Sequence, residues 1–110
     1  MQIPAQITFH GIDHSDAVEK RIHEKIFKLE RIYRNIIRCR VKIETQHQNT
    51  NKLHHKPFHI TINVTVPGYE LIVNRDPKEP HINENINIAL REAFDNMEQK
   101  LKDWINTSNV

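Results

Sequence analysis

The chain has 110 residues, of which 37% are hydrophobic and 27% charged, and its formal net charge is +2. This length supports one domain, residues 1–110, and no apolar run approaches the about 18 residues that a membrane-spanning helix needs. A single cysteine, Cys39, excludes an internal disulfide, and the first residues lack the pattern of a secretory signal, so we expect a cytoplasmic protein with no membrane segment.

The first two elements are a strand and a helix. Residues 3–9 alternate between apolar and polar side chains, which predicts the strand. Ser15 is the expected N-cap of a helix over residues 16–34. Its apolar side chains recur every three or four residues and form a continuous stripe that consists of Val18, Ile22, Ile26, Leu29 and Tyr33. Phe27 falls outside this stripe, and we expect it to pack under a neighbouring loop; the alternative is an exposed contact for a partner.

Three more strands follow the first helix. Residues 37–45 alternate, with the apolar side chains facing inward and the charged ones outward. The polar residues 46–56 have no periodicity and predict an exposed loop. Residues 58–66 alternate again, and the Pro67-Gly68 turn signal predicts that residues 69–75 return as the second strand of a hairpin.

The last element is a second helix over residues 84–105. Its apolar stripe consists of Ile86, Leu90, Ala93, Met97, Leu101 and Trp104. Two amphipathic helices and four half-buried strands in the order βαβββα predict an α+β fold. We expect a two-layer sandwich, in which a four-stranded sheet carries both helices on one face and leaves the other face open to solvent.

The sequence carries no recognisable catalytic or cofactor-binding pattern. GxGxxG, P-loop and GxSxG motifs are absent, and the whole chain has two glycines. Cys39 lies on the inward face of its predicted strand, where a thiol is usually inert. Four histidines surround one loop: His47, His54, His55 and His59. Their spacing differs from that of structural zinc sites, so we interpret them as polar loop residues rather than metal ligands. We expect no enzymatic activity, no metal, no cofactor and no small-molecule substrate.

Charge is distributed unevenly along the chain. Residues 16–40 contain eight Lys/Arg and four Asp/Glu, whereas residues 76–110 contain four and seven. The candidate RNA-binding residues begin on the first helix and continue along the next strand: Lys20, Arg21, Lys25, Lys28, Arg31, Arg38, Arg40 and Lys42. A helix of about 19 residues is roughly 28 Å long, so its cations can meet successive phosphates. The simpler interpretation is a solvated helix surface. The strands show no exposed aromatic pair, so we expect recognition of backbone and shape rather than base stacking.

The element order, together with the segment KIFKLERIY at residues 25–33, resembles the ribosome hibernation-promoting factor family, also called the ribosome-associated inhibitor or sigma-54 modulation family. The resemblance covers nearly the whole chain and corresponds to the short form of the family. It implies a fold like that of double-stranded-RNA-binding domains, with an added first strand. It also implies binding to the small ribosomal subunit in the channel used by messenger and transfer RNA. RNA contact is implied at Lys25 and Lys28, and the helical projection adds Arg21 and Arg31.

Two functions from different classes remain. The first is a non-enzymatic stress-response factor that binds 16S rRNA of the small subunit, inhibits translation and is a monomer off the ribosome. The second is a protein-interaction module that keeps the fold but has lost ribosome binding. The acidic last helix, with Trp104 near its end, favours the second.

Overall fold

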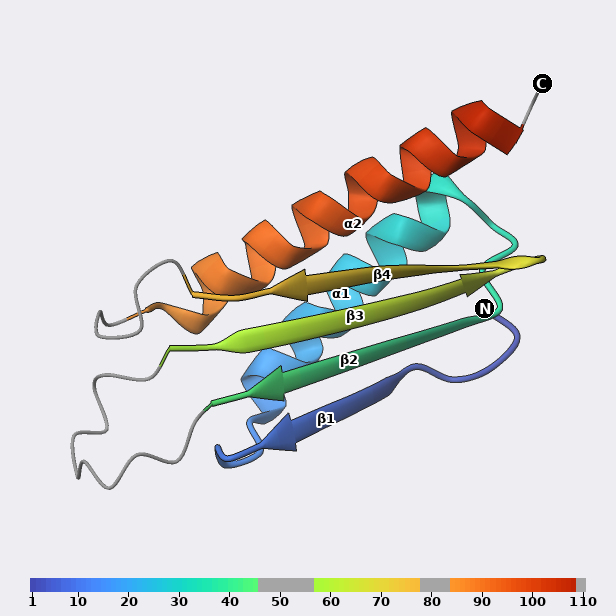
Figure 1. The fold of residues 1–110 in the computed structure, drawn as a ribbon. Helices are drawn as coiled ribbons and strands as arrows, with labels where there is room; N and C mark the ends of the chain where they lie inside the picture. Colours follow the sequence, from blue (N-terminus) through green and yellow to red (C-terminus); the bar gives the residue numbers. More distant parts are fainter. Residues whose placement is uncertain (46–56, 78–83, 109–110) are drawn as a thin grey trace.

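The computed structural model describes residues 1–45, 57–77 and 84–108 (Figure 1). Its elements, in chain order, are β1 (Gln6–His10), α1 (Asp16–Ile32), β2 (Arg38–Glu44), β3 (His59–Val66), β4 (Tyr69–Arg75) and α2 (Ile86–Ser108). The predicted order βαβββα is therefore confirmed, and each boundary lies within three residues of its prediction.

The four strands form one sheet in the order β1-β2-β3-β4. β1 and β2 are parallel, and α1 provides the crossover that a parallel pair requires. β2 pairs with β3 in antiparallel fashion, and so does β3 with β4. The register places Val41 of β2 between Ile7 of β1 and Ile62 of β3, so the apolar positions of neighbouring strands form rows on one face.

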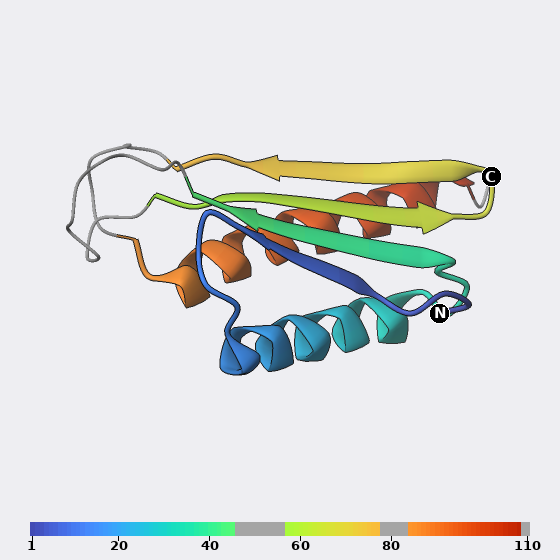
Figure 2. The ribbon, with the colours of Figure 1, turned by 90° about the horizontal axis from the view of Figure 1, so that it is seen from below.

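Both helices cover the same face of the sheet, and the other face is open, as the sequence predicts (Figure 2). The core lies between these layers, and its fully buried large side chains include Ile22, Ile26, Leu29, Ile43, Ile60, Ile62, Leu90, Met97 and Leu101. Phe27 is 62% exposed, so the expectation that a loop covers it is wrong. The helical period turns this side chain away from the buried stripe and toward solvent. Among the described residues, neither helix is long and apolar enough to cross a membrane.

Gly11 fixes the way the chain leaves β1. Its φ of 78° lies in the left-handed region, and a Cβ there would stand 2.4 Å from the Thr45 carbonyl oxygen. The Thr45 amide donates to the His10 carbonyl oxygen at 3.1 Å, which holds the end of β2 against this turn. Only glycine offers both the conformation and the space that this approach requires.

Arg75 connects β3, β4 and the segment that leads into α2. It is 7% exposed and donates to the Phe58 carbonyl oxygen at 3.0 Å, to both Glu84 oxygens and to Glu92 Oε1 at 3.2 Å. Glu84 also accepts the Phe58 amide at 2.8 Å. Burial raises the pKa of Glu84, but the hydrogen bonds from Arg75 and the Phe58 amide, together with the nearby positive charge of Arg75, outweigh it, so the net pKa is lowered.

Candidate nucleic-acid interface

Helix α1 carries most of the candidate residues, and its start and buried side are well defined. The side chain of Ser15, the predicted N-cap, accepts the Val18 amide at 3.3 Å. Three side chains of the predicted stripe, Ile22, Ile26 and Leu29, are at most 2% exposed. These contacts fix the rotation of the helix, so the remaining side chains project from its flanks and its outer side.

The five candidate cations of α1 lie outside its buried stripe. Lys20, Arg21, Lys28 and Arg31 are exposed, and Lys25 is half-buried. Lys28 forms an ion pair with Glu98 of α2, with 3.5 Å between Nζ and Oε2. In the part of the chain that the structure describes, the other four have no carboxylate oxygen within 4.0 Å. Within the described ranges, four of the five therefore have no carboxylate that competes with an external anion such as a phosphate.

Two contacts show which flank of α2 faces α1. Lys28 pairs with Glu98, and the Tyr33 and Trp104 rings meet edge to face with centroids 5.2 Å apart. The two residues of each pair are about 70 positions apart in the sequence. Because this offset is nearly the same for both pairs, α1 and α2 run in the same direction (Figure 1). Trp104, which suggested a free protein contact, is half-buried and packs against the core.

The facing flank of α2 adds two cations that the sequence-based prediction did not include. Lys102 lies one turn beyond Glu98 and pairs with it at 3.6 Å, and exposed Arg91 lies two turns before Glu98 on the same side. The spacing of seven and four residues between Arg91, Glu98 and Lys102 places them on one side of a helix, so a helical projection of the sequence could have identified both cations. Lys100 belongs to a different side of α2, because its Nζ donates to the Ile72 carbonyl oxygen at the β4 edge.

The remaining candidates, Arg38, Arg40 and Lys42, lie on the other side of the sheet. Their neighbours in β2, including Cys39 and Val41, are buried against the helices, and strand alternation turns the three cations to the open face. Arg40 and Lys42 are exposed there, and Lys42 Nζ lies 3.7 Å from Glu44 Oε1. The eight candidate residues therefore occupy two opposite faces rather than one continuous surface.

Cys39 and the loop histidines were the residues considered for a catalytic or metal-binding role. Burial raises the pKa of the Cys39 thiol to about 12, which agrees with the expected inert thiol. Of the four loop histidines, His59 lies in β3 with Nδ1 2.7 Å from Asp76 Oδ1. The other three, His47, His54 and His55, lie outside the described residues.

Comparisons with solved structures agree with this fold. A ribosomal subunit interface protein from Coxiella burnetii superposes with a TM-score of 0.69 at 17% identity, covering 93% of this chain and 97% of that one. The N-terminal domain of Protein Y from Thermus thermophilus gives a TM-score of 0.65 at 17% identity, covering 94% of this chain and 99% of that one. At this identity the likeness shows the fold.

Sequence comparison establishes the family. No curated protein sequence matches the chain significantly. A family model described as "Sigma 54 modulation protein / S30EA ribosomal protein" matches residues 5–106, and this span includes every helix and strand except the end of α2. The resemblance found in the segment at residues 25–33 is thereby confirmed. The chain belongs to the sigma-54 modulation protein / S30EA ribosomal protein family.

Proposed function

We propose that this protein is a cytoplasmic ribosome-associated factor that binds 16S rRNA of the small subunit and inhibits translation under stress. The helix-bearing side of the molecule makes the contact, and the protein acts by occupying space that messenger and transfer RNA need, as a monomer and without catalysis. Membership of the family supports the ribosomal partner. So does the fold shared with a protein described as a ribosomal subunit interface protein.

The observation that carries the proposal is the set of uncompensated cations on α1. Within the described residues, Lys20, Arg21, Lys25 and Arg31 have no ion-pair partner. Cations without a protein carboxylate nearby are available to bind phosphates. Each cation that neutralises a phosphate releases a condensed counterion from the RNA, and this release favours binding. Binding of this kind weakens steeply as the salt concentration rises.

Two arginines on opposite faces provide a matched test. Arg21 of α1 and Arg40 of β2 are both exposed, and neither has a carboxylate within 4.0 Å among the described residues. Arg21→Glu and Arg40→Glu change the net charge equally, so a difference between them reports the face that binds. We expect Arg21→Glu to weaken co-sedimentation with 30S subunits about tenfold, and Arg40→Glu to change it less than about threefold.

The salt dependence separates phosphate contact from other effects. The slope of the logarithm of affinity against the logarithm of salt concentration is expected to fall by about 1 in Arg21→Glu and to stay unchanged in Arg40→Glu. Thermal unfolding of both variants serves as the check on folding. Equal losses in the two variants, or wild-type protein that fails to sediment with ribosomes at low salt, would reject the helix-bearing side as the interface.

Inhibition by occupancy has its own readout. The double variant Arg21→Glu/Lys25→Glu is expected to leave translation of a reporter messenger RNA in a purified system at its uninhibited level, while wild-type protein reduces it. Excess wild-type protein should also displace transfer RNA from 30S subunits. Binding without displacement would show a ribosome-bound protein that does not act by occupancy.

The alternative, a protein-interaction module without ribosome binding, has less support in the structure. Trp104, which favoured it, packs against Tyr33 instead of projecting to solvent. The same sedimentation experiment decides between the two functions. Wild-type protein that remains at the top of the gradient at low salt, and is recovered with another protein, would favour the module.

A further inference from the structure

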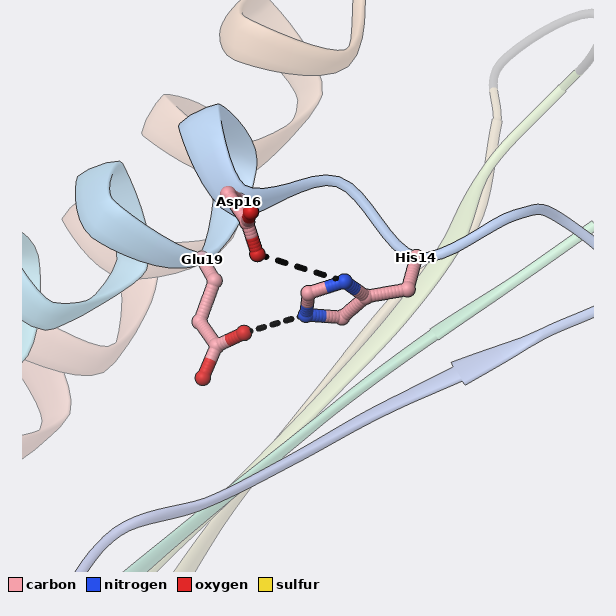
Figure 3. A group of neighbouring side chains, drawn as sticks. All are labelled: His14, Asp16 and Glu19. Atoms are coloured by element: carbon pink, nitrogen blue, oxygen red, sulfur yellow. Dashed lines mark hydrogen bonds and ion pairs between the residues drawn. The ribbon is translucent and has the colours of Figure 1, made fainter.

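A group of metal-ligating side chains lies where the chain enters α1, apart from the proposed RNA contacts. It consists of His14 in the preceding loop and of Asp16 and Glu19 in the first turn of the helix (Figure 3). One possible ligand atom from each residue lies within 4.8 Å of the other two. His14 Nδ1 lies 3.4 Å from Asp16 Oδ1, and its Nε2 is hydrogen-bonded to Glu19 Oε2. The imidazole is thus held between two carboxylates.

The His14 ring and the backbone of the first turn are held in place by their surroundings. The His14 ring meets the Phe9 ring edge to face, with centroids 5.1 Å apart. The Glu19 amide donates to the Ser15 carbonyl oxygen at 2.9 Å, which fixes the first turn between His14 and Glu19. A ligand would therefore meet side chains whose backbone is already ordered, which reduces the entropy lost on binding.

A second imidazole approaches the same carboxylate. His23 lies one turn after Glu19, and its Nε2 is 3.8 Å from Glu19 Oε1. Glu19 thus presents one oxygen to each of two histidines. Two imidazoles with two carboxylates form a donor set suited to Zn²⁺, whereas Ca²⁺ and Mg²⁺ prefer oxygen ligands alone.

We propose that His14, Asp16 and Glu19 form a binding site for Zn²⁺, with His23 available as a fourth ligand. The side chains of His14, Asp16 and Glu19 are 55%, 97% and 37% exposed, so the ion can enter directly from solvent. The side chains would have to rotate to bring their donor atoms to the about 2 Å from one ion that zinc requires. The inference does not depend on the proposed ribosomal function.

The test is zinc binding by the full-length chain without an affinity tag. The protein is treated with EDTA, exchanged into metal-free buffer and titrated with ZnCl₂ by calorimetry, with CaCl₂ in a parallel titration. We expect saturable binding of Zn²⁺ at this site and none of Ca²⁺ at the same concentrations. His14→Gln and Glu19→Gln should each weaken zinc binding by about tenfold or more.

His10→Gln is the matched control. His10 is also an exposed imidazole near a carboxylate, 3.8 Å from Glu44 Oε1, but it lies at the end of β1 outside the group. This variant should bind Zn²⁺ with nearly the affinity of wild type. Shifts of the His14 imidazole nitrogens in NMR spectra on adding ZnCl₂ give a second readout that does not rely on a variant.

Three outcomes would overturn the proposal. They are an absence of saturable Zn²⁺ binding in wild type, equal binding of Ca²⁺, and zinc affinity that survives both His14→Gln and Glu19→Gln. The last result would assign zinc to other residues, such as the histidines at positions 47, 54 and 55.

Discussion

Glu98 lies between two lysines on the facing flanks of the helices. Its carboxylate oxygens are 3.5 Å from Lys28 Nζ and 3.6 Å from Lys102 Nζ, and its side chain is 19% exposed. A carboxylate in this position lowers the attraction of the helix-bearing side for phosphates, because it neutralises two amines that could otherwise meet them. We therefore expect its charge to weaken the proposed interface.

Glu98→Gln is expected to increase affinity for 30S subunits about three- to tenfold at low salt, because it leaves both lysines uncompensated. The measurement is co-sedimentation over a salt series. Glu44→Gln provides the control, since Glu44 also accompanies a lysine, Lys42, but on the open face of the sheet. An equal gain in both variants would point to net charge rather than to a local contact.

Comparing substitutions at the two glycines distinguishes the cost of backbone strain from the cost of a steric clash. Gly11 and Gly68 have nearly the same φ, 78° and 77°. A Cβ at Gly11 would approach the Thr45 carbonyl oxygen to 2.4 Å, whereas one at Gly68 would meet nothing within 4 Å. We expect Gly68→Ala to lower the free energy of unfolding by about 1–2 kcal/mol through strain alone. Gly11→Ala should cost clearly more in urea unfolding, and equal costs would contradict the steric argument.

At the scale of elements, the network around Arg75 connects strands to α2. The side chains of Arg75 and Glu84 are 7% and 15% exposed, and their closest nitrogen and oxygen are 2.6 Å apart. The hydrogen bond to Glu84 also raises the pKa of Arg75. Since these groups join the start of β3, the end of β4 and the approach to α2, the network positions α2 against the sheet.

This network predicts a dependence of stability on pH. The folded-state pKa of Glu84 is lowered, so its contribution is present above its unfolded pKa and is lost as the pH falls through the folded value. Glu84→Gln should be less stable than wild type at neutral pH, by about 3 kcal/mol at most, and the difference should shrink as the pH falls toward about 3. Urea unfolding at several pH values measures this.

Glu24→Gln is the control for the pH experiment. Glu24 is exposed on α1, and within the described ranges it forms no ion pair, so its replacement should leave the unfolding curves unchanged at each pH. A difference between Glu84→Gln and wild type that persists unchanged at the acidic end of the series would show that the side-chain charge is not its cause.

At the scale of the whole molecule, Cys39 reports on global unfolding. It is 1% exposed in the core, and burial raises its pKa to about 12. Because the thiolate is the reactive form, iodoacetamide at about pH 8 should label native protein only when the core opens, and unfolded protein in urea much faster. Mass spectrometry follows the single thiol. Rapid labelling of native protein would contradict a closed core.

The sheet also divides the charges of the whole molecule. The cations of α1 and α2 lie on the helix-bearing side, and those of β2 lie on the open face beside polar residues such as Asn63 and Thr61. The comparison of Arg21→Glu with Arg40→Glu depends on this separation.

The sequence by itself determined the elements and the inward face of each. Alternation placed the strands, and the recurrence of apolar residues every three or four positions placed both helices, because these patterns depend on local backbone geometry. Ser15 was identified as the N-cap for the same reason. The five cations of α1 also follow from helical projection alone, although their role as RNA contacts stays a prediction.

Only the tertiary structure decided how these elements face one another. The pairing of Lys28 with Glu98 and the approach of His14 to Glu19 depend on relations between elements or on the course of a turn. The helical period placed Phe27 outside the buried stripe, but only the tertiary structure showed that this side chain stays 62% exposed. Such contacts join residues distant in sequence or turns with irregular backbone, and no local period encodes them.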